Sequence, residues 1–250
     1  MSRGRALALQ LAVVGALLLV WEVVVRAGAV DARLLPPFTD VFARFLAMLG
    51  DTTVLHHLWV TVSEMLVSFL IVTPLGIGVG LLLGESDFLG KAFKPFFFFM
   101  ASVPKSVFLP LFILALGFGF AQKVAFGVFQ AIFVLVISAI AAADSIPPDF
   151  VKMGRAFGAT RRQQYQLIYL PAMLPVIVEG LRLGMLFSVT GVLFAEMYVS
   201  RAGLGFLIAN WGSRFELANL LAGILIAALL SIFINETLRW FERRLGAWRI

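Results

Sequence analysis

Long apolar stretches constrain this chain more than any other feature of its sequence. Six of them lie near residues 6–25, 58–83, 95–116, 122–143, 172–195 and 216–238. Crossing a bilayer core about 30 Å thick takes roughly twenty apolar residues in a helix. Backbone amides in lipid must be paired within the segment, and the stretches lack the alternating pattern of barrel strands. The sequence therefore predicts an all-α integral membrane protein with six transmembrane helices.

The composition fits this class and excludes several others. Hydrophobic residues make up 61% of the chain and charged residues 14%, which is more apolar surface than a soluble domain of this size buries. The net charge of +6 comes from cations at the ends of the stretches, which disfavours nucleic acid as a partner. Cysteine is absent and the two histidines, His56 and His57, are adjacent, which gives no metal-site spacing. We expect no metal and no cofactor.

The basic residues predict the orientation of the spans, because Lys and Arg resist translocation. Six lie on one side, namely Arg26, Arg33, Arg44, Lys123, Arg201 and Arg214. Twelve lie on the other side, namely Arg3, Arg5, Lys91, Lys94, Lys152, Arg155, Arg161, Arg162, Arg239, Arg243, Arg244 and Arg249. We therefore expect both termini and the loop 144–171 on the cytoplasmic side of the inner (plasma) membrane. The first stretch lacks a clear cleavage site, so it is expected to remain as a span.

The segment between the first two stretches has helical character of its own. Leu34-Leu35-Pro36-Pro37 leads into residues 38–49, where apolar side chains recur at helical spacing. This pattern predicts an interfacial helix on the outer face of the membrane.

The loop 144–171 carries the signals of two short helices. Pro147-Pro148-Asp149 is typical of a helix start, and Gly158 is a natural stop. Thr160-Arg161-Arg162-Gln163 reads as a capping box that opens a second helix. Phe150, Met153 and Phe157 share one face of the first helix. Such a knob fits a groove on another protein, and the alternative is an amphipathic helix that rests on lipid headgroups.

Several motifs occur along the chain in a characteristic order. They are Leu34-Leu35-Pro36-Pro37, Pro74-Leu75-Gly76, Leu81-Leu82-Leu83-Gly84, Gly158-Ala159-Thr160, Ile168-Tyr169-Leu170-Pro171, Pro175, Gly180-Leu181-Arg182, Ala195-Glu196 and Gly203-Leu204-Gly205. With these motifs the chain resembles the membrane-spanning permease subunits of ATP-binding-cassette (ABC) importers of the nitrate, sulfonate and taurine type. One departure is Lys152-Met153-Gly154, where the family usually has Glu-Ala-Ala; the segment from Gly117 to Asp144 is also less typical.

The resemblance implies a fold and a division of the chain. The fold is the six-helix type I importer permease (MetI-like) bundle with a cytoplasmic coupling helix. Residues 1–57 would form an N-terminal span and a periplasmic interfacial helix, and residues 58–250 the permease core with its coupling loop 144–171. The residues that would couple to an ATPase are Lys152, Met153, Gly154, Phe157, Gly158, Ile168, Leu170 and Pro171.

The resemblance also implies a function and partners. The chain would form half of the translocation pathway for a small, anionic solute: a sulfonate, taurine, nitrate, bicarbonate or a pyrimidine vitamin precursor. Its partners would be ABC ATPase subunits, a periplasmic or lipid-anchored solute-binding protein and a second permease copy, most simply as a homodimer. Because the chain has no phosphate-binding loop, ATP hydrolysis is expected on a separate subunit, and the chain itself is not an enzyme.

Charged residues inside the spans require an explanation, because burying a charge in lipid is costly. Glu179 and Arg182 stand three residues apart, so they can neutralise each other, with a structural or gating role. Lys105 is a candidate for the translocation pathway, and the alternative is an ion pair with Glu64. Glu196 is a second pathway candidate, and the alternative is a position at headgroup level.

Two other classes of protein share the apolar composition. A self-sufficient secondary transporter or channel would be expected to show inverted repeats and matching broken helices. A membrane-embedded enzyme would need polar catalytic groups clustered at one depth. Neither pattern is visible in the sequence, so the importer permease is the preferred hypothesis.

Overall fold

The computed structural model describes residues 3–198 and 200–245, and within them every regular element is a helix. The helices are α1 (Arg3–Arg26), α2 (Phe38–Met48), α3 (Thr52–Glu85), α4 (Asp87–Ser102), the 3-10 helix η1 (Lys105–Phe108), α5 (Leu109–Leu116), α6 (Phe120–Asp144), α7 (Pro148–Ala156), α8 (Arg161–Gln164), the π-helix η2 (Tyr165–Tyr169), α9 (Leu170–Tyr198), α10 (Leu204–Ser213) and α11 (Leu217–Leu245). Of the basic residues counted above, Arg249 lies outside the described residues.

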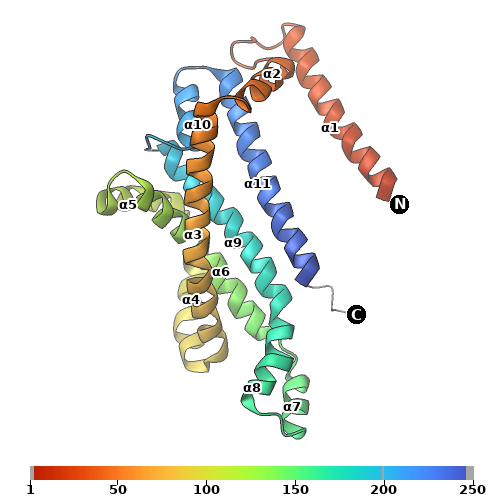
Figure 1. The fold of residues 1–250 in the computed structure, drawn as a ribbon, viewed down its shortest axis with the longest axis vertical. Coiled ribbons are helices and arrows are strands. Elements are labelled where there is room, and N and C mark those ends of the chain that lie inside the picture. The colour runs from red at the N-terminus through yellow and green to blue at the C-terminus, as the bar shows by residue number, and fades with distance from the viewer. Residues whose placement is uncertain (1–2, 199, 246–250) are drawn as a thin grey trace.

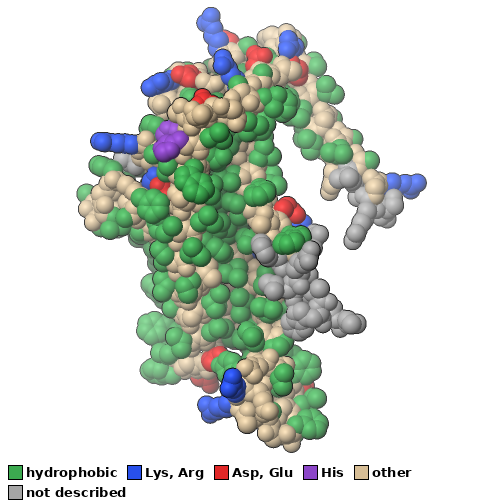
Figure 2. All heavy atoms as spheres, viewed as in Figure 1, with side chains coloured by type: hydrophobic (Ala, Val, Ile, Leu, Met, Phe, Trp, Pro, Cys, Tyr) green, Lys and Arg blue, Asp and Glu red, His purple; other side chains and the backbone are tan. Residues whose placement is uncertain are grey.

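The prediction of an all-α membrane protein is confirmed. Five described helices are long and apolar enough to cross a membrane, or six if α4 and α5 are counted as one bent span. Figure 1 shows an elongated bundle, with α2 and α10 at one end and α7 and α8 at the other. We call these the α10 end and the loop end. Apolar side chains cover most of the flank between them, and charged side chains gather mainly towards the two ends (Figure 2).

The centre of the bundle is the packing of α3, α6 and α9, and small residues make it possible. A methyl group added at Gly76 would lie 2.5 Å from Leu135 Cβ, and one at Gly80 would lie 2.4 Å from Ala139 Cβ. On α9, Gly184 meets the same Leu135 side chain. Close approach through glycine replaces the hydrophobic effect as the driving force between helices in lipid. Gly76 and Gly80 of α3 therefore serve helix packing.

The expected third span, near 95–116, is not one continuous helix. α4 ends at Ser102, and the α4 and α5 segments are bent by 93° at the break. Val103 has an extended backbone, with φ −75° and ψ 135°, and Pro104 follows it. A residue before proline is driven out of the helical region by the proline ring, and proline has no amide hydrogen to continue the ladder. The apolar pattern of residues 95–116 predicted a continuous span and did not indicate this break.

The helix expected over residues 38–49 is present as α2, and it packs on the bundle. Its Val41 and Met48 are buried in a cluster with Leu204 and Ile208 of α10 and Ile226 of α11. The apolar pattern of the sequence did not predict α10. α1 joins the bundle through α2, where the Trp21 indole donates to the Pro36 carbonyl at 3.1 Å, and the rest of α1 extends away from it (Figure 1).

Substituting Gly80 with alanine tests the central packing. The new carbon would also lie 2.5 Å from the Val136 carbonyl oxygen, so α3 and α6 would have to separate. We expect a lower midpoint of thermal unfolding in detergent, by the equivalent of about 1–3 kcal/mol. Gly78→Ala is the matched control, because nothing lies within 4 Å of its added carbon. It should leave the midpoint unchanged or raise it slightly, since alanine favours helix more than glycine; equal losses for both variants would contradict this packing.

Candidate functional site

The loop between α6 and α9 folds as its sequence predicts. α7 begins at Pro148 with Asp149 in its first turn, and Gly158 adopts a φ of +71° just after the helix ends. The Thr160 amide donates to the Gln163 side chain at 2.8 Å, and the Gln163 amide donates back to the Thr160 hydroxyl at 3.4 Å. This is the predicted capping box. The two helices form a knob at the loop end of the bundle (Figure 1).

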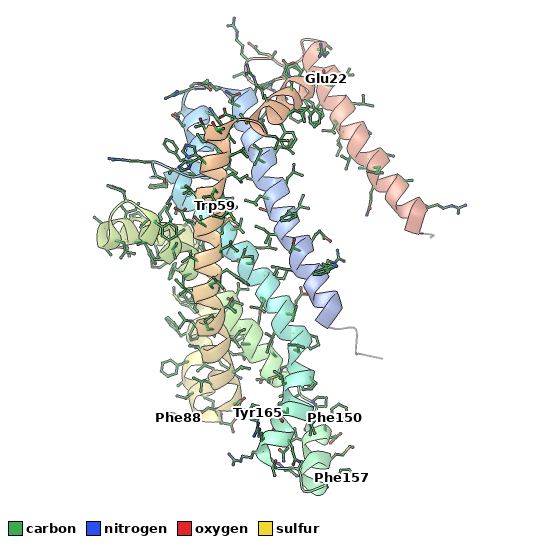
Figure 3. The ribbon with its side chains drawn as sticks, viewed as in Figure 1. Glu22, Trp59, Phe88, Phe150, Phe157 and Tyr165 are labelled. Atoms are coloured by element: carbon green, nitrogen blue, oxygen red, sulfur yellow. The ribbon has the colours of Figure 1, made fainter. Side chains whose placement is uncertain are left out.

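One side of this knob is an apolar hollow of about 530 Å³. Phe150, Met153 and Phe157 line it from α7 and its end, and all three are more than half exposed. Phe157, at 85% exposure, lies near the tip of the knob (Figure 3). Of the predicted coupling residues, five line this hollow: Met153, Gly154, Phe157, Ile168 and Pro171.

Gly154 is explained by the packing inside the knob. A methyl group added there would lie 2.6 Å from Cδ1 of Ile168, so the π-helix occupies the space that an alanine would need. Leu170 does not line the hollow and is half exposed at the start of α9.

Lys152 lies on the other side of α7. It lines a second hollow of about 600 Å³ with Arg155, Arg161 and Tyr165. Its ammonium pairs with Asp149 of its own helix at 3.1 Å, and both side chains are more than three-quarters exposed. An exposed pair of this kind contributes little to stability, so the positive charge of Lys152 is available to a partner.

One polar contact joins the segment after the knob to the bundle: the Tyr165 hydroxyl donates to Glu85 at the end of α3. Within the bundle, Lys94 of α4 pairs with Asp144, the last residue of α6 before the knob, at 3.5 Å. Glu179 and Arg182, early in α9, form the ion pair that their spacing predicts. The knob is thus connected to α6 and α9 through the chain and to α3 through Tyr165.

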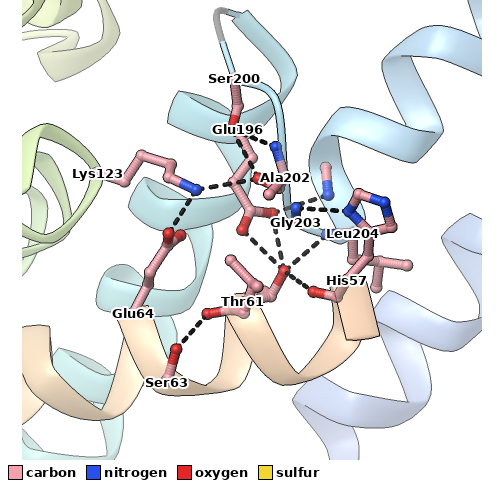
Figure 4. Close-up of polar contacts among 12 residues, drawn as sticks. His57, Thr61, Ser63, Glu64, Lys123, Glu196, Ser200, Ala202, Gly203 and Leu204 are labelled. Atoms are coloured by element: carbon pink, nitrogen blue, oxygen red, sulfur yellow. Dashed lines mark hydrogen bonds and ion pairs between the residues drawn. The ribbon is translucent and has the colours of Figure 1, made fainter. Parts of the chain in front are cut away.

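A second polar site lies at the α10 end, where residues from α3 and α9 meet the turn before α10 (Figure 4). The Thr61 hydroxyl donates to the Glu196 carboxylate at 2.8 Å and accepts from the Leu204 amide at 2.7 Å. The Gly205 amide donates to the same carboxylate at 2.8 Å. The Gly203 amide donates to His57 Nδ1 at 2.9 Å. Both Thr61 and Glu196 are buried.

An ion pair lies next to these contacts. Lys123 of α6 pairs with Glu64 of α3, and its ammonium also donates to the Ala202 carbonyl at 3.0 Å. Both charged side chains are at least 95% buried. A buried charge is tolerated when it is paired and hydrogen-bonded. We call the group His57, Thr61, Glu64, Lys123, Glu196 and residues 202–205 the polar cluster.

The polar cluster corrects one sequence-based alternative. The ion pair of Lys105 with Glu64 is wrong, because Lys105 bonds the Ala101 carbonyl at 3.0 Å and sits over the Phe133 ring. The bend before Lys105 keeps its side chain beside α4 and α6. Glu196 is buried within the protein, with 1% of it exposed, and its position at headgroup level stays a prediction. The sequence did not predict Lys123 as the partner of Glu64. The available signal was its position as a cation at the start of an apolar stretch.

The site residues contain no recognisable metal centre. Within residues 3–198 and 200–245, no three His, Asp or Glu side chains are grouped as a metal ion would require. The two sites differ instead in physical character: an exposed apolar and basic knob at the loop end, and a buried charged cluster at the α10 end.

Comparison with known proteins gives the context for both sites. The family model for "binding-protein-dependent transport system inner membrane component" matches residues 73–247. The taurine transport system permease protein TauC of Escherichia coli is 28% identical, over 98% of this chain and 90% of its own. The aliphatic sulfonates permease SsuC of Bacillus subtilis, whose assignment is putative by name, is 27% identical over 92% of this chain and 83% of its own. The nitrate import permease NrtB of Synechocystis is 24% identical over 74% and 68%.

Solved structures agree on the fold. An inward-facing MetNI methionine ABC transporter matches with a TM-score of 0.66 and 19% identity, over 76% of this chain and 94% of that one. A bacterial ABC transporter that imports the acidic polysaccharide alginate matches with a TM-score of 0.64 and 15% identity, over 96% of both chains. The MetI-like bundle is therefore confirmed.

Substituting Thr61 with valine tests the polar cluster. Valine keeps the shape but removes the donor to Glu196 and the acceptor for the Leu204 amide. Leaving buried polar groups unpaired costs about 2–4 kcal/mol for two groups, and we expect the thermal midpoint to fall accordingly. Thr190→Val is the matched control, because the Thr190 hydroxyl is exposed and bonds only the Leu186 carbonyl of its own helix among the described contacts. It should change stability by no more than about 0.5 kcal/mol.

Proposed function

Because this chain belongs to the family of binding-protein-dependent transport system inner membrane components, it is an ABC importer permease, and we propose that its knob docks on a separate ATPase subunit. The observation that carries this proposal is the exposed apolar hollow beside Phe157. Exposed apolar patches rimmed by charge mark protein interaction sites. Arg155, Lys152 and Arg161 line the second hollow, on the other side of α7, so the knob presents basic groups next to its apolar face.

The knob suits a protein groove better than a lipid surface. It is a compact pair of capped helices that projects at the end of the bundle (Figure 1), with Phe157 near its tip (Figure 3). A helix that rests on headgroups turns its apolar face towards the hydrocarbon. We infer that Lys152, where relatives usually carry an acid, meets an acid on a matched ATPase, since complementary charge selects the partner.

We propose that the translocation pathway opens alternately to the two sides of the membrane, and that the loop end and the α10 end of the chain move in opposite senses as it does so. From Glu64 to Glu85, α3 extends about 32 Å at 1.5 Å per residue, close to the thickness of the bilayer core. α9 runs from the knob to Glu196 in the polar cluster. ATP-driven displacement of the knob would pull on α9 and so bias the polar cluster between closed and open states. The ion pair of Glu179 and Arg182 would stabilise the first part of α9, which moves in this gating step.

The assembly and orientation are part of the same proposal. A second copy of this chain would complete the pathway as a homodimer, and a solute-binding protein would deliver solute at the α10 end, taken as the outer side. Both termini and the knob would lie in the cytoplasm. Residues 1–57 would be an addition to a core of 58–250, in keeping with a family match that starts at residue 73.

The solute is inferred to be small and anionic. The relatives are named for taurine, aliphatic sulfonates, nitrate and formylaminopyrimidine, and we extend that range of solutes to this chain. Lys105 and Glu196 remain the proposed pathway residues. Lys105 is buried at the bend between α4 and α5, where its cation lies 5.6 Å from the centre of the Phe133 ring.

Gly158→Leu tests the docking. Leucine disfavours the φ of +71° by about 1–2 kcal/mol, which should distort the knob and weaken both ATPase co-purification and ATP-dependent uptake at least tenfold. Gly28→Leu is the matched control, because Gly28 has a φ of +76° and, like Gly158, nothing within 4 Å of an added carbon. Normal uptake by the Gly158 variant would refute docking through the knob, and uptake by the chain alone would favour a secondary transporter.

Lys152→Glu tests the charge at the same interface. If the partner presents an acid, the substitution places like charges together, and we expect ATPase affinity to fall about tenfold, with the loss reduced at high salt. Lys91→Glu, a cation change on α4, is the comparison. An unchanged or higher affinity for Lys152→Glu would contradict an acidic partner group.

A further inference from the structure

The polar cluster holds more negative than positive charge among its buried groups. Glu64 of α3 and Glu196 of α9 bring two carboxyl groups, and Lys123 of α6 brings one ammonium group. All three residues are at least 97% buried. If all of them were ionised, one negative charge would lack a counter-charge inside the protein, which is strongly disfavoured. The cluster therefore needs one more positive charge, and a proton on a carboxyl group would supply it.

The other titratable side chains around the cluster, within the described residues, do not provide that charge. His57 of α3 accepts the Gly203 amide through Nδ1, so its ring is in a neutral form. The neighbouring His56 is exposed, and so is Arg201 in the turn between α9 and α10. Helix α10, which packs against this turn, carries no charged residue. The missing charge therefore has to come from within the cluster.

The contact between the two carboxyl groups indicates where the proton sits. Glu64 and Glu196 share a side-chain hydrogen bond, and two ionised carboxylates have no donor with which to make one. Lys123 keeps Glu64 ionised through their ion pair. Apart from Glu64, the partners of Glu196 among the described contacts are neutral: the Thr61 hydroxyl and the Gly205 amide, each at 2.8 Å (Figure 4). Glu196 is therefore the carboxyl group that carries the proton.

We propose that the polar cluster is a proton-binding site, in which Glu196 donates a bound proton to Glu64, and that this proton holds the α10 end closed. The site itself stands on burial, charge and hydrogen bonding, whereas its role in closure rests on the proposed function. Without the proton, two carboxylates would face each other between α3 and α9, and like charges at short range repel. α3 would then move away and release the Gly203 and Leu204 amides from their acceptors on α3.

A cavity beside the cluster gives the proton a route. It has a volume of about 400 Å³ and is lined by Glu64, Lys123 and Arg201, among others. A water molecule occupies about 30 Å³, so the cavity has room for several. When the proton leaves, the O–H bond of the Glu196 carboxyl group breaks, its electron pair stays on the carboxylate, and water takes the proton. Reprotonation reverses this step and closes the α10 end again.

Infrared spectroscopy of the full chain tests the proton directly, because a protonated carboxyl group has a carbonyl stretch that a carboxylate lacks. The chain is studied in dodecyl maltoside, a detergent without carbonyl groups. Carboxyl groups in contact with water are ionised at neutral pH, so we expect an acid band equivalent to about one carboxyl group per chain. Glu196→Gln should remove this band. Glu236→Gln is the matched control, because the Glu236 side chain is 54% exposed, and it should leave the band unchanged.

Hydrogen exchange of the Gly203 and Leu204 amides tests the closure. Glutamine at position 196 keeps a donor towards Glu64 but has no proton to lose, so the Glu196→Gln chain should stay closed as the pH rises. At alkaline pH we expect these amides to exchange at least about tenfold faster in the wild-type chain than in Glu196→Gln, and at the same rate in both at acidic pH. Comparison at equal pH removes the intrinsic pH dependence of exchange.

The two measurements separate the parts of the proposal. A wild-type chain without an acid band at neutral pH, or a band that Glu196→Gln leaves in place, overturns the proton site. Equal exchange in both chains at alkaline pH overturns its role in closure. Folding is checked by the thermal midpoint, and the wild-type band keeps the test decisive if Glu196→Gln fails to fold. Because neither measurement involves an ATPase, failure here is distinct from failure of knob docking.

Discussion

The structure depends on one constraint: in lipid, polar groups must find their partners within the protein. The polar cluster meets it for Glu196 and for one oxygen of Glu64 by drawing on a cation from α6, a hydroxyl from α3 and a backbone amide at the start of α10. Removing one member leaves the others unpaired where water cannot replace it. The cluster therefore fixes how α3, α6, α9 and α10 meet at that end.

The packing of α3, α6 and α9 connects the polar cluster mechanically with the rest of the bundle. Contacts of Gly76, Gly80 and Gly184 bring the helices close together, and close-packed helices shift as units because they are not easily deformed. α9 starts just after the knob and carries Glu196 of the polar cluster near its other end. The polar cluster and an ATPase docked on the knob would thus bias the same helix, which is the physical requirement for coupling ATP hydrolysis to transport.

The knob illustrates how a departure from a family pattern can be local. Gly154 stands where relatives usually have alanine because Ile168 fills the space above it. Lys152 pairs within its own helix and remains exposed. The apolar hollow, which Gly154 lines, is present on the opposite side of α7. The altered charge therefore leaves the construction of the knob unchanged, and we propose that it acts on the choice of partner.

The sequence by itself determined the membrane class, most span positions, α2 and the capped helices of the knob. These follow from hydropathy, proline, glycine and capping residues, which act over a few positions. Tertiary structure alone decided the helix α10 and the pairing of Glu64 with Lys123, 59 residues later in the chain. Those features depend on which helix faces meet, and a buried charge selects its partner by proximity in space, which hydropathy along the chain does not encode.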